Sequence, residues 1–431
     1  MSAVGYEGGG ELIRPVPVEE SSRGYVRDEL LQKEFDTAAQ TLLDNDGCND
    51  PERGGENGLV ADLALEGGGV KGIGLVGAVL VLDEAGYRFR GVAGTSAGAI
   101  AASLIAGLSQ SDVPMTNLLS YMNSLEFANF MPEGKLHRLL DHVGGHAGDL
   151  VADAAILSRQ MGIYNGDYLR SWLGPILHDE LKVRTFADLK LTTQDDPDLS
   201  LPAGHEYRLV VNTSDITRAQ LVRLPWDFPL YGRVPVDNED PVEAVRASMS
   251  IPFFFEPVTF EATKATVSIP TPSGGSTELT YGGGTVTWVD GGLLQNFPIH
   301  AFDRDDGAKP RWPTIGIKLS RQQRSFPATE GCQSALAVGV RCLRTMMNEW
   351  DTYAIDEQTA ARTIFVDNAG LSATDFNLTK QDQDRLFING VTAATEFVIA
   401  MARAGGVPRT SDASKNLVNK RRALGGVAPS L

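Results

Sequence analysis

The sequence has few cysteines, an excess of acidic over basic residues, and no long unbroken apolar run. Three cysteines among 431 residues (Cys48, Cys332 and Cys342) cannot form a disulfide framework and lack metal-ligand spacing, so a reducing, cytoplasmic compartment is expected. The formal net charge of −17 argues against a nucleic-acid partner and against simple electrostatic adhesion to anionic lipid. The run from Val92 to Leu108 is too short and too polar for a membrane span, and no secretion signal is expected at the start.

Strand-like and helix-like segments alternate from Leu59 to about Arg324, which predicts an α/β fold with a parallel sheet. Helical patterns dominate from Cys332 onward. We therefore expect four segments: a flexible acidic arm with one helix at 1–58, a core at 59–325, a helical part packed on the core at 326–405, and a loose basic tail at 406–431.

The segment VAGTSAGAIAASLIAGL places Ser96 where an apolar strand pattern ends and a helix pattern begins. A serine in a tight strand-to-helix turn needs small neighbours, because side chains beside it would collide with the turn. Gly94 and Gly98 meet that need, which favours a nucleophile elbow with Ser96 at its tip. Gly-x-Ser-x-Gly is a short pattern, so the residues around it have to support the interpretation.

A glycine-rich loop precedes the serine by one strand and one helix. The buried-strand pattern LVADLALE leads into GGGVKG at residues 67–72, and FRGVAGT forms the next strand, which ends before Ser96. One right-handed βαβ crossover brings the loop and Ser96 to the same edge of the sheet. Backbone N–H groups of the loop, together with that of Ala97 at the helix start, can receive a developing oxyanion.

The same loop also matches the dinucleotide-binding pattern, with glycines at positions 67, 69 and 72. That function requires an acidic residue at the end of the second strand to bind the ribose. The second strand ends instead in Gly94-Thr95-Ser96, and no Gly-Lys-Ser/Thr of a phosphate loop follows. The oxyanion loop is the favoured interpretation.

A serine nucleophile needs a base, and the histidines are poorly placed for it. None follows His300, so the late histidine of an α/β-hydrolase is missing. The segment TVTWVDGGLLQNFP predicts a strand ending at Asp290, and Gly291 and Gly292 allow a sharp turn after it. A carboxylate beside Ser96 in a site short of water gains basicity, so Asp290 is the predicted base. The alternative is that Asp-Gly-Gly is only a turn.

In that order, EGGGVKG, GTSAG and DGG resemble the motifs of the patatin-like phospholipases. ASMSIPFFFEPV, at 247–258, is similar to the family's ASxxxPxxFxPV segment, and DGGLLQNFP to its DGGxxxNxP segment. The resemblance covers about residues 60 to 400. It implies a three-layer sandwich of helices around a mostly parallel sheet, here with a helical C-terminal extension, and no metal or cofactor.

The resemblance also assigns roles to single positions. It implies Ser96 as nucleophile and Asp290 as general base, with Lys71 anchoring the glycine loop or, alternatively, contacting a phosphate headgroup. The oxyanion hole would be formed by the N–H groups of Gly67, Gly68, Gly69 and Val70, together with that of Ala97, which its place at the helix start supplies. The supporting motif positions are Gly72, Gly94, Gly98, Gly291 and Gly292.

We therefore expect a serine lipid acyl hydrolase of the phospholipase A or lysophospholipase type, with a phospholipid or lysophospholipid as substrate and transient contact with a membrane surface. A general carboxylesterase or acyltransferase is the alternative within the enzyme class. A membrane-degrading effector activated by a partner is the alternative from a different class, suggested by the acidic arm and the helical C-terminal region. A homo-oligomer or an activating partner is a further expectation.

Overall fold

The computed structural model describes the core of the chain and parts of both ends. The described residues are 13–15, 25–45, 59–126, 129, 166–191, 206–270, 276–304, 310, 312–319, 338–339, 341–342, 345–346, 355–371 and 378–410. Most of the tail predicted at 406–431, and residues 1–12, 16–24 and 46–58 of the predicted arm, lie outside these ranges. The division into four segments stays a prediction.

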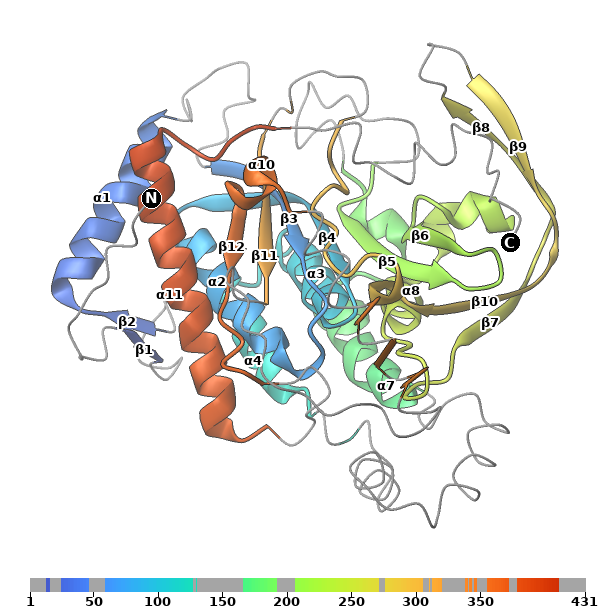
Figure 1. Cartoon of the computed structure of the whole chain (residues 1–431), viewed down its shortest axis with the longest axis horizontal. Coiled ribbons are helices and arrows are strands. Elements are labelled where there is room, and N and C mark those ends of the chain that lie inside the picture. The colour runs from blue at the N-terminus through green and yellow to red at the C-terminus, as the bar shows by residue number, and fades with distance from the viewer. Residues whose placement is uncertain are drawn as a thin grey trace.

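An eight-stranded sheet forms the centre of the molecule (Figure 1), in the order β12-β11-β3-β4-β5-β10-β7 with β6 paired to β5. Its strands are β3 (Leu59–Leu65), β4 (Tyr87–Thr95), β5 (Leu209–Asp215), β6 (Gln220–Leu224), β7 (Val258–Ala262), β10 (Gly284–Asp290), β11 (Thr314–Lys318) and β12 (Thr363–Phe365). The five strands from β12 to β5 are parallel, whereas β6, β10 and β7 pair antiparallel. The predicted α/β fold with a mostly parallel sheet is confirmed.

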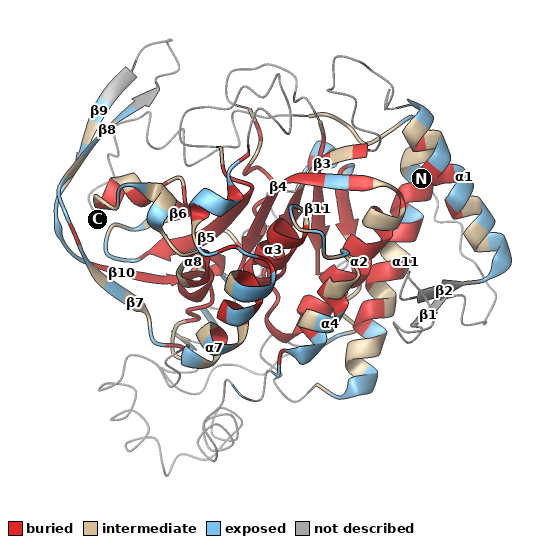
Figure 2. Ribbon diagram, turned by 180° about the vertical axis from the view of Figure 1, so that it is seen from behind, coloured by how far each residue is buried: buried red, intermediate tan, exposed pale blue. Residues whose placement is uncertain are grey.

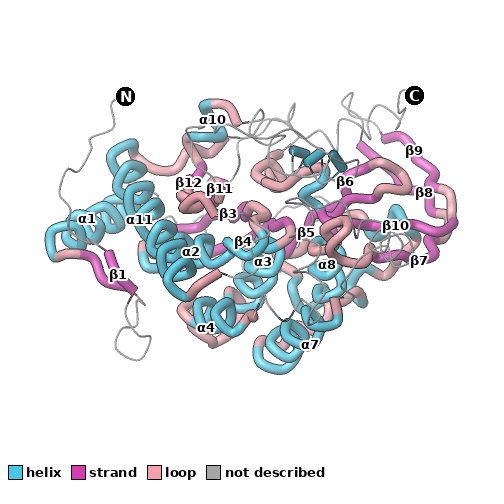
Figure 3. The backbone as a smooth tube through the Cα atoms, turned by 60° about the horizontal axis from the view of Figure 1, so that its bottom comes forward, coloured by secondary structure: helices cyan, strands magenta, loops and turns pink. Residues whose placement is uncertain are grey.

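The main helices gather on one face of the sheet (Figure 3). The α-helices are α1 (Glu29–Asn45), α2 (Ile73–Glu84), α3 (Ala97–Leu108), α4 (Asn117–Ser124), α7 (Asp167–Pro175), α8 (Pro241–Ser248), α10 (Glu357–Ala360) and α11 (Lys380–Ala404). Successive side chains of a strand point to opposite faces, so Leu63 and Leu65 of β3 join the large core under the helices. Ala64 between them packs against Phe297 and Ile299, which cover the other face.

Short elements complete the described chain. They are the hairpins β1–β2 (Ile13–Pro15, Tyr25–Arg27) and β8–β9 (Ala265–Pro270, Ser276–Tyr281), and the single turns η2 (Gly69–Gly72), η4 (Ile176–Glu180), η5 (Phe186–Leu189), η6 (Phe228–Tyr231), η7 (Val236–Asn238) and η8 (Gly291–Leu293). The hairpin β8–β9 extends along the end of the molecule that carries β7 and β10 (Figure 1).

Two glycines let helix α11 lie directly on helix α2. A Cβ atom at Gly77 would lie 2.3 Å from the carbonyl oxygen of Phe387, and one at Gly390 would lie 2.1 Å from that of Gly74. Within the described residues, α11 is the one helix long and apolar enough to cross a bilayer. Its apolar residues include Leu386 and Val391, which belong to the core that α2 shares.

Helix α1 has an apolar face at helical spacing. Its buried residues Phe35, Ala38, Ala39 and Leu42 recur every three to four positions, as an amphipathic helix requires. Asp28 caps the helix by accepting a hydrogen bond from the Leu31 N–H at 2.7 Å. In contrast, α2 and α3 are buried along most or all of their length (Figure 2), because they lie between the sheet and the outer helices.

Candidate active site

Ser96 occupies a strained turn between β4 and α3. Its φ is +53° and its ψ is −126°, a conformation that costs a residue with a Cβ atom roughly 1–2 kcal/mol. The flanking glycines make this turn possible. A Cβ atom at Gly94 would lie 2.2 Å from the Gly98 carbonyl oxygen, and one at Gly98 would lie 2.4 Å from that of Leu65. The Gly-x-Ser-x-Gly pattern is therefore a packing requirement of the elbow.

Ser96 is 2 % exposed and is bonded to the end of helix α8. Its backbone N–H donates to Oγ of Ser248 at 2.8 Å, and its hydroxyl points to Sδ of Met249 at 3.6 Å. These contacts join residues more than 150 positions apart in the sequence. The orientation of the Ser96 side chain thus depends on the turn that follows α8.

Asp290 ends strand β10 and is fully buried. Its Oδ1 accepts the Gly292 N–H at 2.7 Å, and its own N–H donates to the Ser250 carbonyl oxygen at 2.8 Å. Burial raises the pKa of Asp290 to about 7, against the lowering effects of the Gly292 N–H and of the nearby Ser96 hydroxyl. Among the residues that the structure describes, Oδ2 has no hydrogen-bond partner of ordinary length, so one oxygen is free to accept a proton.

Strand register explains why Ser96 and Asp290 lie together. Thr95, the last residue of β4, pairs with Asn212 of β5, and Asp290 pairs with Thr213 of the same strand on its other side. Ser96 and Asp290 are therefore level across β5, about two strand spacings apart. Strand β10 runs antiparallel to β5, so the chain approaches this edge from outside the sheet and Asp290 lies there as the last residue of β10. The rule that parallel strands end at the same edge does not explain its position.

The glycine loop offers unpaired donors beside the serine. The N–H groups of Gly68, Gly69, Val70 and Ala97 have no acceptor among the residues that the structure describes. Such buried, unpaired donors are rare unless a ligand uses them. The conformation of Gly69, with a φ of +54°, turns the loop at this point.

Gly67 does not belong to this donor set. Its N–H donates to the carbonyl oxygen of Asn296 at 2.9 Å, while the Asn296 side-chain amide donates back to the Gly67 carbonyl oxygen at 2.9 Å. A Cβ atom at Gly67 would lie 2.2 Å from Asn296 Oδ1, so glycine is needed there for close packing. The prediction that Gly67 donates to an oxyanion is wrong, because the segment after Asp290 already uses its N–H.

Lys71 belongs to the glycine loop, and its side chain is buried in a cluster of charged groups. Burial lowers the pKa of Lys71, opposed by the nearby carboxylate of Glu66. Glu66 is bonded to the Lys318 ammonium group and to the backbone N–H of Leu319. Gly72, the last loop glycine, packs near Met122 and Ala97, where a Cβ atom would lie 3.3 and 3.6 Å away.

The glycines after Asp290 have separate roles. A Cβ atom at Gly291 would lie 2.3 Å from the carbonyl oxygen of Asn212, so the chain could not pass β5 with a larger residue. Gly292 supplies the N–H that binds Asp290. Both roles follow from the sharp turn that the sequence predicts.

The two histidines that the structure describes take part in other interactions. His178 contacts Asp240, and His300 contacts Asp303. The remaining four histidines lie outside the described residues. Within those residues, no group of three or more His, Cys, Asp or Glu side chains is arranged to hold a metal ion.

Sequence reasoning missed four residues that shape the site: Ser248, Met249, Ser250 and Asn296. Each lies inside a segment whose pattern was recognised, yet the patterns carry no information about contact partners. Their proximity to Ser96, Asp290 and Gly67 arises only when the sheet forms.

A family model described as patatin-like phospholipase matches residues 63–303 of the chain. The uncharacterised protein YqhO of Bacillus subtilis (strain 168) is 32% identical over 323 residues, covering 75% of this chain and 92% of that protein. Two solved structures are also similar. VipD of Legionella pneumophila matches with a TM-score of 0.40 at 14% identity, over 79% of this chain and 67% of that one. The ExoU–SpcU complex of Pseudomonas aeruginosa matches with a TM-score of 0.34 at 16% identity, over 78% and 51%.

Proposed function

The chain belongs to the patatin-like phospholipases, a family of lipid acyl hydrolases, and we propose that it cleaves the acyl ester bonds of glycerophospholipids or lysophospholipids through a Ser96–Asp290 dyad. The observation that supports this assignment is a convergence at one edge of the sheet. A strained serine, a buried carboxylate with an unpaired oxygen, and four unpaired N–H groups come from three distant segments. Acyl transfer needs these three components.

In the proposed first step, Ser96 Oγ attacks the ester carbonyl carbon and transfers its proton to Asp290 Oδ2. The carbonyl oxygen becomes an oxyanion, which the N–H groups of Gly68, Gly69, Val70 and Ala97 stabilise. When the tetrahedral intermediate collapses, the carbon–oxygen bond to the alcohol breaks, and the alcohol leaves with the proton from Asp290. An acyl-Ser96 ester remains.

In the second step, a water molecule transfers a proton to Asp290 and its oxygen attacks the acyl-enzyme. The Ser96 oxygen then leaves and regains a proton from Asp290, which releases the fatty acid and restores the site. The raised pKa of Asp290, at about 7, suits both proton transfers, because a base works best when its pKa lies near the working pH. In this proposal Lys71 anchors the loop through its attraction to Glu66.

The net charge and the number of cysteines bear on which membrane surface the protein would contact to reach its substrate. With a net charge of −17, we propose a transient contact with lipid that does not depend on attraction to anionic headgroups. Three cysteines in 431 residues favour a reducing compartment, so the cytoplasmic leaflet is the proposed surface. A homo-oligomer or an activating partner stays a prediction.

The test uses phosphatidylcholine vesicles and the purified full-length chain. We expect Ser96→Ala and Asp290→Asn each to lower fatty-acid release by roughly a thousandfold or more, as for residues of other catalytic groups that act as a unit. Ser103→Ala is the matched control, since Ser103 is a buried serine of α3, the helix that follows Ser96, and its hydroxyl donates to the Ile100 carbonyl oxygen. Wild-type release by either dyad variant would contradict the assignment.

Substrate class is tested separately by comparing vesicles with a short-chain soluble ester. A phospholipase should show the higher kcat/KM on aggregated long-chain lipid. A higher value on the soluble ester would point to a general carboxylesterase, and acyl transfer to an added alcohol in preference to water would point to an acyltransferase.

A further inference from the structure

The turn that follows helix α8 contacts both members of the proposed dyad. Ser248 Oγ accepts a hydrogen bond from the Ser96 N–H, and Met249 Sδ accepts one from the Ser96 hydroxyl. The Ser250 carbonyl oxygen accepts one from the Asp290 N–H. Three consecutive residues thus hold Ser96 from one side and Asp290 from the other. The separation of the two groups depends on the conformation of this turn.

We propose that Arg246 is a positioning residue that fixes this turn and thereby sets the distance between Ser96 and Asp290. The Arg246 side chain is buried, with 3 % of the residue exposed. Its Nη1 donates to Oγ of Ser250 at 2.5 Å and its Nη2 donates to the Glu256 carbonyl oxygen at 2.8 Å. Ser250 Oγ donates back to the Arg246 carbonyl oxygen at 3.1 Å, so the turn is closed at both ends.

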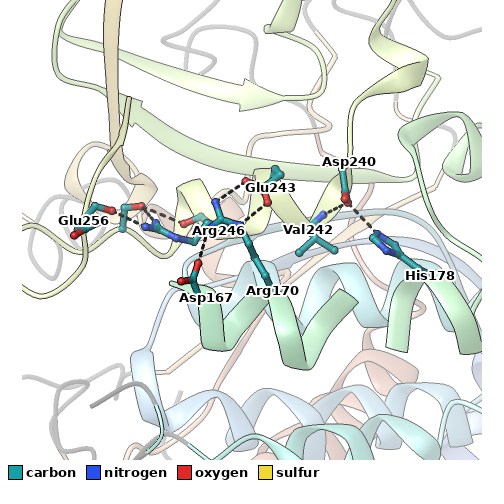
Figure 4. A network of polar contacts seen from close by, with 9 residues as sticks. Asp167, Arg170, His178, Asp240, Val242, Glu243, Arg246 and Glu256 are labelled. Atoms are coloured by element: carbon teal, nitrogen blue, oxygen red, sulfur yellow. Dashed lines mark hydrogen bonds and ion pairs between the residues drawn. The ribbon is translucent and has the colours of Figure 1, made fainter. Parts of the chain in front are cut away.

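Helix α7 and the glycine before it lie next to Arg246 and are bound to α8 (Figure 4). Gly166, which precedes α7, packs so closely that a Cβ atom there would lie 1.8 Å from Arg246 Nε. Arg170 of α7 binds Glu243 of α8 through two hydrogen bonds of 2.6 and 2.8 Å and also contacts Asp167 at 3.2 Å (Figure 4). The bonds between Arg170 and Glu243 tie α7 to α8.

The start of α8 is held in the same way. Asp240 accepts the Val242 N–H at 2.8 Å and contacts His178 Nε2 at 3.2 Å (Figure 4). Both ends of a short helix are therefore tied to neighbouring segments, and its last turn cannot move independently of them. This is the support that a precisely placed nucleophile and base require.

The contribution of Arg246 is geometric and not a direct electrostatic effect on the base. The Arg246 guanidinium binds Ser250 Oγ and the Glu256 carbonyl oxygen, and neither of these atoms belongs to Asp290. Meanwhile Asp290 Oδ2 forms no ordinary hydrogen bond, so the gap for proton transfer depends on small displacements of the backbone. A displacement of about 1 Å at a reacting group can cost roughly a hundredfold in rate.

The experiment measures kcat and KM on monomeric dihexanoyl phosphatidylcholine, below its micelle concentration, for Arg246→Met, Ser250→Ala and the double variant. We expect each single variant to lower kcat by between about 10-fold and 100-fold with KM changed less than about threefold. Because the two side chains share the Arg246 Nη1–Ser250 Oγ bond, the kcat of the double variant should lie within about threefold of the lower of the two single-variant values. Arg246→Lys, which can keep one of the two bonds, should recover part of kcat.

Arg208→Met is the matched control. Arg208 is also buried and donates to the backbone carbonyl oxygens of Phe89 and Arg90, but it lies at the amino end of β5, away from the dyad. It should lose thermal stability and keep its kcat, with all assays run well below the melting temperatures. Equal losses of kcat in Arg208→Met and Arg246→Met would overturn the proposal.

The inference rests on the proposed function, and the outcomes separate the two. If Ser96→Ala keeps its activity, the dyad itself is wrong. If Ser96→Ala is inactive while Ser250→Ala and Arg246→Met keep the wild-type kcat, only the positioning role fails. Should Arg246→Met not fold, Ser250→Ala alone decides, because it removes the same bond with a small change in volume.

Discussion

Replacing Asp290 by Asn should abolish turnover and at the same time stabilise the protein above neutral pH. Burial raises the pKa of Asp290 from 3.8 to about 7 in the folded state. The folded protein then binds this proton more tightly than the unfolded chain, so the contribution of Asp290 to stability is greatest at low pH and falls as the pH rises from about 4 to 7. Above pH 7 the charged carboxylate is buried at its full cost.

The size of the effect follows from the shift. About three pKa units at 1.36 kcal/mol each give roughly 4 kcal/mol of lost stability at pH 8. Linkage places about 2 kcal/mol of that loss already at pH 5, because the carboxyl group of the unfolded chain is ionised there. The amide that replaces the carboxyl group is neutral at both pH values, so its own contribution to stability does not change with pH.

The assay is urea unfolding of wild type and Asp290→Asn at pH 5 and pH 8. The difference in free energy of unfolding between variant and wild type should shift in favour of the variant by about 2–3 kcal/mol between the two pH values. Other titrating groups cancel in this difference. Asp303→Asn is the control, because His300 and Arg362 hold the pKa of Asp303 below its usual range. It should destabilise at both pH values. If the difference in free energy of unfolding between Asp290→Asn and wild type does not change with pH, the pKa of Asp290 is not raised by burial.

Three further predictions concern the elbow, the helix contact and the base. Ser96→Gly should be more stable than Ser96→Ala by about 1–2 kcal/mol in thermal unfolding, because glycine alone adopts the positive φ without strain. Equal stability of the two variants would contradict the backbone strain inferred at Ser96. Gly390→Ala should lose about 1–3 kcal/mol by calorimetry, since its Cβ atom would meet the Gly74 carbonyl oxygen, whereas Gly174→Ala, with nothing within 4 Å, should not. Wild-type kcat should fall tenfold per pH unit below about 7 as Asp290 takes up a proton, and a flat profile from pH 5 to 8 would argue against it as base.

The elbow could be predicted from the sequence because its geometry is local. Gly94 and Gly98 flank Ser96 within five residues, and the turn they allow depends on sterics near the serine. The glycine loop and its crossover were predictable for the same reason, since one βαβ unit has a single favoured hand.

Asp290 was predicted correctly as a strand end, although its route to the site was not. The pattern TVTWVDGG indicates where the strand stops, but not that β10 runs antiparallel to β5. Which strands pair, and in which direction, depends on the packing of segments far apart in the chain.

The amino-acid sequence alone determined the positions of the turns, because glycine, serine and strand periodicity act over a few residues. Tertiary structure decided which polar atoms find partners. The Asn296 carbonyl oxygen accepts a hydrogen bond from the Gly67 N–H. At the end of α8 and in the turn after it, Ser248 accepts the Ser96 N–H and Ser250 accepts the Asp290 N–H. It also decided the pKa of Asp290, because burial depends on everything that surrounds the carboxyl group and no short pattern of residues records it.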